Sequence, residues 1–105
     1  MLTDEQIMIR DMARGYAQDR LAPTAAAREK AGRIEAEVIA ELGELGFLGM
    51  TIDPDWGGAG ADYVAYALAL MEIAAGDGSV STMVSVHNAP VCAVIDRFGT
   101  DAQKA

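Results

Sequence analysis

The spacing of apolar residues along this chain predicts a series of α-helices. Thr3 followed by Gln6 has the spacing of a capping box, so the first helix is expected to begin there. Pro23 is expected to break this helix near Leu21 and Ala22. Its apolar face recurs at intervals of three and four residues and comprises Ile9, Met12, Ala13, Tyr16 and Ala17.

Two shorter helices are expected next. Residues 24–30 are rich in alanine and charge, which favours a short exposed helix ending near Gly32. A third helix is predicted from about residue 35 to residue 45, with Gly46 as a natural C-terminal stop. Residues 48–52 are too few to assign by pattern.

Two unusually apolar segments follow. Residues 62–76 are helical by composition, and Glu72 is their only charge after the start. A helix that is apolar all round is expected to be buried. The second segment, residues 80–98, is expected to be capped by Ser79 or Ser81 and kinked by Pro90. Because a short turn joins the two helices, they should form a central antiparallel pair.

The chain ends just after a further helix start. Thr100 and Gln103 repeat the capping-box spacing, and the sequence stops at Ala105, as in a piece of a longer protein. The pattern therefore predicts an all-α fold of about five helices plus the start of a sixth, in a single domain over residues 1–105.

Composition narrows the function classes. A net charge of −8 over 105 residues disfavours nucleic acid and anionic membrane surfaces as partners. The N-terminus lacks the pattern of a signal peptide, and the longest apolar run is too short to span a bilayer. Cys92 is the only cysteine, which favours a reducing compartment and a cytoplasmic location.

Candidate chemistry in the chain is sparse. Gly58 and Gly60 invite a nucleotide-binding interpretation, but Tyr63 stands where a third glycine would be needed, so a structural turn is favoured. Glu72 is expected to pair with an arginine. His87 has no neighbouring ligand types, so a hydrogen-bonded structural histidine is expected, and no metal site or catalytic residue is predicted.

Two further features of the sequence invite interpretation. Cys92 lies among apolar residues and is expected to be a small core residue. Trp56, the only tryptophan, is expected to anchor the glycine turn.

A row of small hydroxyl residues opens the helix that begins near residue 80. Small side chains of mixed polarity can leave room for a ligand. The same hydroxyls can instead bond back to carbonyls one turn earlier. Spacing alone leaves both interpretations open for Ser79, Ser81, Thr82 and Ser85.

Several motifs in order resemble one known family. They are Leu2-Thr3-Asp4-Glu5-Gln6, the region of Pro23, Glu41-Leu42-Gly43-Glu44-Leu45-Gly46-Phe47, Trp56-Gly57-Gly58-Ala59-Gly60, the helix from Leu68 to Ala74, Ser85-Val86-His87-Asn88 and Phe98-Gly99-Thr100. Together they resemble the N-terminal helical domain of acyl-CoA dehydrogenases, over essentially the whole chain.

The resemblance implies an FAD-dependent enzyme that dehydrogenates an acyl-CoA thioester and passes electrons to an electron-transferring flavoprotein, as a homo-oligomer. It also implies that a β-domain and a C-terminal helical bundle, which hold the flavin and the catalytic base, lie outside this chain. Residues 1–105 alone are then expected to bind no FAD and to be inactive. The positions that match one wall of the acyl-chain pocket are Thr82, Ser85, Val86 and Ala89.

Other functions remain compatible with the same region. Acyl-CoA oxidases and flavin monooxygenases share the three-domain plan. A stand-alone helical interaction module without chemistry is the alternative from a different class.

Overall fold

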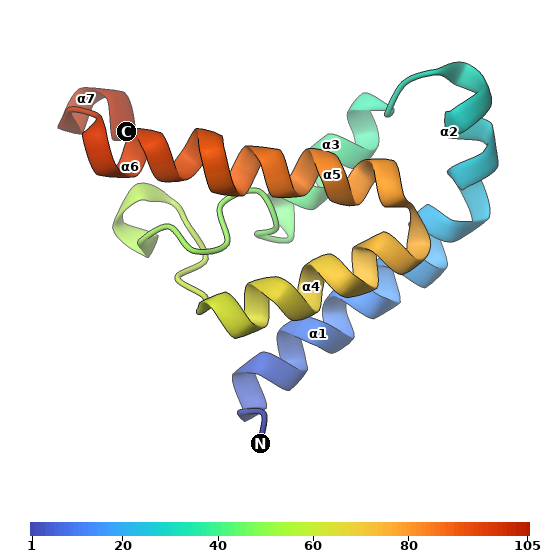
Figure 1. The fold of residues 1–105 in the computed structure, drawn as a ribbon, viewed down its shortest axis with the longest axis horizontal. Helices are drawn as coiled ribbons and strands as arrows, with labels where there is room; N and C mark the ends of the chain where they lie inside the picture. Colours follow the sequence, from blue (N-terminus) through green and yellow to red (C-terminus); the bar gives the residue numbers. More distant parts are fainter.

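The structure, a computed structural model, describes all residues from Met1 to Ala105 and is entirely helical apart from its connections. Figure 1 shows α1 and α4 side by side, with α5 returning above α4 and α3 behind α5. The elements, in order, are α1 (Asp4–Tyr16), the π-helix η1 (Ala17–Leu21), the 3₁₀-helix η2 (Ala22–Thr24), α2 (Ala25–Ala31), α3 (Ala36–Glu44), the 3₁₀-helix η3 (Pro54–Trp56), α4 (Tyr63–Gly76), α5 (Gly78–Val86), the π-helix η4 (His87–Cys92), α6 (Ala93–Phe98) and α7 (Asp101–Lys104).

The all-α prediction is confirmed, because every element is a helix. α5, η4 and α6 form one continuous helical stretch, and α7 is the expected start of another helix. The chain does not leave the helical path at Pro23, however. It passes instead through a π-turn and a 3₁₀-turn, which accommodate the missing N–H of proline before α2 begins.

The capping box of α1 also fixes the start of α4. The hydroxyl of Thr3 accepts a hydrogen bond from the Gln6 amide at 3.1 Å, and the Gln6 side chain accepts one from the Thr3 amide. The same Gln6 side chain donates to Asp62 at 2.8 Å, and Asp62 accepts from the Ala65 amide as the N-cap of α4. Two helix N-termini that are far apart in sequence therefore share one polar cluster.

The core lies where α1, η1, α3, α4 and α5 meet. Small residues allow a close approach, since a Cβ on Gly76 would lie 2.8 Å from the Ala17 carbonyl oxygen. The fully buried apolar residues are Ala13, Ala17, Leu21, Val38, Leu42, Phe47, Met50, Ala69, Ile73, Val80 and Val84.

The expectation that residues 62–76 form a buried helix is wrong for this chain by itself. Only one row of α4 is buried, and Tyr63 and Met71 are 75% and 68% exposed. Val86 and Phe98 are likewise exposed along the next helical stretch. The molecule measures 40 × 35 × 18 Å, so along its shortest direction it is about two helices thick and cannot enclose a helix on all sides.

The stretch Gly78–Phe98 has 21 residues and is long and apolar enough, by length and composition alone, to cross a bilayer. This corrects the expectation that no segment has sufficient length. The observation is weak evidence of a membrane helix, because core helices can pass the same test.

Residue Arg28 overturns the expectation that α2 is a purely exposed helix. Its side chain is 3% exposed and donates from Nε to Asp77 at 2.8 Å, while Nη1 lies 3.2 Å from the Glu35 carboxylate. Asp77 in turn caps α5 by accepting from the Ser79 amide at 2.9 Å, so neither Ser79 nor Ser81 is the cap. A carboxylate accepts hydrogen bonds more strongly than a hydroxyl, which explains the choice.

Two polar residues on the apolar helices are held by specific partners. Glu72 accepts from Arg14 at 2.8 Å, which confirms the expected ion pair between α4 and α1. Asn88 is 2% exposed, and its Oδ1 accepts from the Met50 amide at 2.8 Å. Its Nδ2 donates to the carbonyls of Phe47 and Val84. Asn88 thus pins the end of α5 to the connector after α3.

Replacing Asn88 with alanine should destabilise the protein by about 2–4 kcal/mol, because the Met50 amide and the Phe47 carbonyl would be left buried and unpaired. Chemical denaturation of the wild type and of N88A measures the difference. Gln103→Ala is the control, since it removes side-chain hydrogen bonding only at the exposed start of α7. Equal stability of N88A and Q103A would contradict this role.

Acid should weaken the fold through Asp77. Burial opposes ionisation of this carboxyl, but hydrogen bonds from Arg28 and Ser79 outweigh it and hold the pKa of Asp77 below its ordinary value. A depressed folded-state pKa gives stability that is complete above the unfolded pKa, about 4, and is lost as the pH falls through the folded value. Thermal unfolding between pH 6 and pH 2 should show less acid sensitivity in Asp77→Asn than in the wild type. Identical slopes would contradict the assignment.

Candidate functional site

The four residues expected to form a pocket wall lie along one outward side of α5 and the start of η4. Val84 and Asn88 point into the core from the opposite side of the same stretch. Thr82 and Ala89 are exposed, Ser85 is half-buried and Val86 is 51% exposed. The structure thus brings Thr82, Ser85, Val86 and Ala89 together as a surface without charged side chains, which is called the α5 face below.

The hydroxyl row at the start of α5 is divided between the two interpretations. Thr82 donates to the Gly78 carbonyl one turn earlier at 3.1 Å, as expected for ordinary helix packing. Ser81 donates to the Leu70 carbonyl of α4, and Ser79 donates to Asp77. Ser85 donates no side-chain hydrogen bond within the chain, although its carbonyl accepts from the Tyr66 hydroxyl at 3.4 Å. Ser85 is therefore the hydroxyl of this row that remains available to another molecule or domain.

The turn around Gly58 has a structural explanation. Gly57 and Gly60 have φ of 87° and 64°, which favour glycine. A Cβ on Gly58 would lie 2.1 Å from the Ile52 carbonyl oxygen. The Gly60 amide donates to that same carbonyl at 2.9 Å. The glycines therefore let two backbone segments pack together, and the space that a phosphate would need beside Gly58 is filled by protein.

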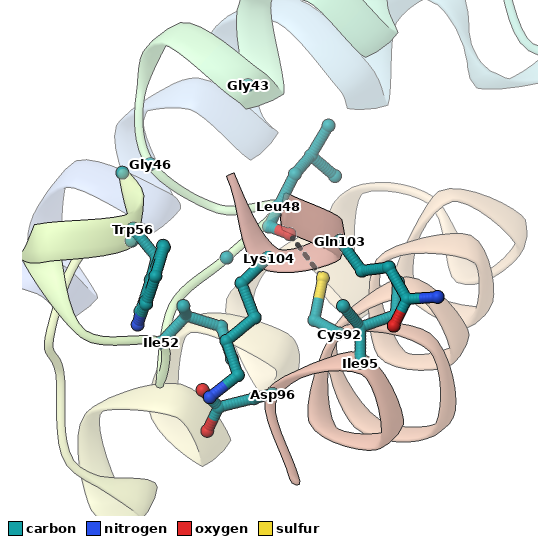
Figure 2. A pocket seen from close by; sticks show the side chains of 13 residues that line it. Gly43, Gly46, Leu48, Ile52, Trp56, Cys92, Ile95, Asp96, Gln103 and Lys104 are labelled. Atoms are coloured by element: carbon teal, nitrogen blue, oxygen red, sulfur yellow. Dashed lines mark hydrogen bonds between the residues drawn. The ribbon is translucent and has the colours of Figure 1, made fainter. Parts of the chain in front are cut away.

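Trp56 is not the buried anchor that the sequence suggests. It is 36% exposed and forms one side of a cavity of about 330 Å³ between the glycine turn and the α6–α7 corner. Figure 2 shows Trp56 on one side of this cavity and Cys92 and Ile95 on the other, with Lys104 between them. The Lys104 ammonium lies 5.5 Å from the Trp56 ring centroid, within the range of a cation–π contact.

The cavity contains no arrangement suited to nucleophilic catalysis. The Cys92 thiol donates to the Leu48 carbonyl at 3.5 Å, and burial raises the pKa of this thiol. A raised pKa keeps the sulfur protonated and weakly nucleophilic, in line with the expectation that Cys92 is not a nucleophile. The expectation of a core residue is wrong, because Cys92 is half-buried and lines this cavity instead of joining the core.

Asn88, and not His87, is the hydrogen-bonded polar residue of this part of the helix. His87 is half-buried and forms no side-chain hydrogen bond within the chain, so the expected hydrogen-bonded histidine is wrong. The adjacent Asn88 carries three hydrogen bonds instead. The sequence pattern assigned no structural role to Asn88. The one available signal was an amide in the middle of an apolar helix, where burial requires partners.

The structure gathers no group of three or more His, Cys, Asp or Glu side chains that could hold a metal ion. None of the three cavities described for the chain includes a residue of the α5 face. That face is thus open in residues 1–105, and a closed pocket there would need a second wall from elsewhere.

Comparison with known proteins gives a consistent picture. The chain matches the family described as "Acyl-CoA dehydrogenase, N-terminal domain" over residues 3–105. It is 37% identical over 103 residues to the mitochondrial short-chain specific acyl-CoA dehydrogenase of Bos taurus, covering 98% of this chain and 25% of that protein. The chain spans about a quarter of the length of the curated relatives that it matches.

Solved structures agree with the sequence relatives. A chain from a structural study of the electron transferring flavoprotein of Acidaminococcus fermentans aligns with a TM-score of 0.93 and 36% identity, over 99% of this chain and 27% of that chain. A glutaryl-CoA dehydrogenase from Mycobacterium smegmatis in complex with FADH2 aligns with a TM-score of 0.91 and 33% identity, over 98% of this chain and 26% of that chain. Since the family match extends from Thr3 to the last residue, this chain belongs to the family of acyl-CoA dehydrogenase N-terminal domains.

Proposed function

We propose that residues 1–105 are the N-terminal helical domain of an FAD-dependent acyl-CoA dehydrogenase, which carries out α,β-dehydrogenation of an acyl-CoA thioester. Family membership supports this proposal, as do relatives about four times as long as the chain. The β-domain and the C-terminal bundle would belong to the remainder of such a subunit. Acyl-CoA is the proposed substrate, and an electron-transferring flavoprotein is the proposed acceptor.

Within that enzyme, the proposed task of this domain is to supply one wall of the acyl-chain pocket. The observation that carries the proposal is the α5 face, an exposed and uncharged surface on a helix whose other side is fixed in the core. An acyl tail is apolar and gains free energy from leaving water against such a surface. Val86 and Ala89 would contact the acyl tail. Thr82 and Ser85 would contribute small polar side chains that leave space for the tail.

The flavin does not fit the residues of this domain. When bound, FAD would supply the acceptor for the hydride of the reaction. The glycine turn offers no cradle for its pyrophosphate, because the Ile52 carbonyl oxygen occupies the space beside Gly58. The net charge of −8 also repels phosphates. The proposal therefore assigns the flavin to the rest of the subunit, and residues 1–105 alone are expected to be inactive.

The open apolar surface also suits a domain inside a larger assembly. Phe98 is 75% exposed and Met71 is 68% exposed, and they lie on different helices. Surfaces with many large exposed apolar side chains are typical of contacts with other proteins or domains. A homo-oligomer of full-length subunits is proposed on this basis. The competing function, a stand-alone interaction module, would share these surfaces. A β-rich segment encoded after Ala105 would exclude the stand-alone module.

Filling the α5 face should shorten the acyl chains that the full-length enzyme accepts. Ala89→Leu adds volume at an exposed position of this domain, and Ser85→Leu adds volume at a half-buried position one turn earlier. Long-chain substrates should lose kcat/KM by about 10–200-fold, and short ones far less, because the clash occurs where the tail ends. Steady-state kinetics across saturated acyl-CoA thioesters of increasing length measure the effect.

Ala27→Leu is the matched control, since Ala27 is an exposed alanine on α2, far in sequence from the α5 face. It should leave the length profile unchanged. Thermal unfolding of the same variants tests the alternative, in which Ser85 and Ala89 serve only helix packing. Loss of stability together with an equal loss of activity for every chain length would remove the assignment of the wall.

A further inference from the structure

The beginning of α5 is held by a single carboxylate that serves two partners. One oxygen of Asp77, Oδ1, accepts from the Ser79 amide at 2.9 Å, from the Ser79 hydroxyl at 2.7 Å and from the Val80 amide at 3.4 Å. The other oxygen, Oδ2, accepts from Arg28 Nε at 2.8 Å. The N-cap residue of α5 is therefore fixed relative to α2, because its second carboxylate oxygen is bound to Arg28 of α2.

Arg28 is itself immobilised by its remaining donors. Its Nη1 donates to the Thr24 hydroxyl at 2.7 Å and to both oxygens of Glu35 at 3.2 Å, and its Nη2 donates to the Leu21 carbonyl at 2.5 Å. The side chain is 3% exposed. A planar guanidinium with its donors engaged on several sides holds direction as well as distance. Arg28 thus connects the end of η1, the start of α3 and the start of α5.

The geometry of α5 transmits this anchoring to the α5 face. Thr82 lies one turn after the cap and is bonded to the Gly78 carbonyl, so it moves with the helix start. Ser85 follows Asp77 by eight residues, or about 12 Å of helix axis, so a tilt of about 5° at the cap displaces it by about 1 Å. A displacement of that size is enough to matter in a substrate site, where about 1 Å can cost about 100-fold in rate.

We propose that Arg28 is a positioning residue for the acyl pocket. By fixing Asp77 it sets the placement of α5, and through α5 it sets the chain-length preference of the enzyme. The proposal rests on the proposed function, because it requires that the α5 face lines the pocket. Arg28 lies on another helix from that face and contacts no residue of it among the hydrogen bonds and ion pairs of the structure. Its direct link to α5 is the ion pair with Asp77.

A second ion pair of the same length serves as the control. Arg14 and Glu72 also lie 2.8 Å apart, but they join α1 to α4, and the Arg14 side chain is 54% exposed. Breaking this pair removes a cross-helix ion pair without touching the cap of α5. If Arg28 has a purely structural role, breaking the Arg28–Asp77 pair and breaking the Arg14–Glu72 pair should differ only in the stability that is lost.

The test uses the full-length enzyme with Arg28→Leu, Arg28→Lys, Asp77→Asn and Arg14→Leu. Asp77→Asn is the decisive variant, because asparagine still caps a helix but presents no carboxylate to Arg28. The kcat/KM ratio of long to short saturated acyl-CoA thioesters is measured for each variant, beside thermal unfolding. A loss of stability alone does not change this ratio.

The expected result is a change of about 10-fold or more in the ratio for Asp77→Asn and Arg28→Leu, as for a misfit of about one methylene. The ratio for Arg28→Lys should lie between the ratios of these variants and that of the wild type, because lysine keeps the positive charge but lacks the planar set of donors of a guanidinium. Arg14→Leu should leave the ratio unchanged. If Arg28→Leu does not fold, Asp77→Asn decides.

Two outcomes overturn the proposal, and they can be told apart. If Ala89→Leu alters the length profile while Asp77→Asn leaves it flat, the pocket wall stands and Arg28 has no positioning role. If Ala89→Leu also leaves the profile flat, the wall itself is wrong and the positioning role falls with it.

Discussion

The arrangement of this domain depends on the burial of one arginine. The guanidinium of Arg28 is a full positive charge that is buried. The protein is only about two helices thick, so few apolar side chains are available to hold distant elements together. Its cost of desolvation is offset because Asp77, Glu35 and the Leu21 carbonyl surround the guanidinium. Breaking such a buried pair costs about 3–5 kcal/mol in general, more than a typical surface ion pair contributes. Polar contacts thus fix helix positions that a larger domain could fix by apolar packing.

Local patterns predicted the helices well because helix signals are local. The capping boxes at Thr3 and Thr100, the stop at Gly32 and the pairing of Glu72 all rest on short-range spacing or on a simple rule about buried charge. The same short-range signals predicted the all-α class. Burial was predicted less well. An apolar helix indicates that some surface should cover it, but the covering surface of α4 and α6 can lie outside residues 1–105.

The missed features depend on contacts between distant positions. Arg28 and Asp77 are 49 residues apart, and nothing near Arg28 in an alanine-rich segment indicates that it is buried. Asp77 is the cap of α5 in place of Ser79, and its second oxygen accepts from this distant arginine. Trp56 looked like an anchor in a glycine-rich turn, but the turn is closed by backbone hydrogen bonds instead. Placing the α5 face required the fold, because residue spacing could not show which side of the helix the core would cover.

The π-turn at His87–Cys92 has a consequence for the direction of the long helical stretch. The residues that face the rest of the chain, Val80, Val84, Asn88 and Cys92, recur every four residues. An ideal α-helix advances about 100° per residue, so this spacing would drift by about 40° at each step and turn the last of these residues away from the first. The wider turn around Pro90 takes up one extra residue and cancels much of that drift. One helix can therefore keep a single line of contact from its capped start to the cavity beside Trp56, and its opposite side keeps one constant orientation.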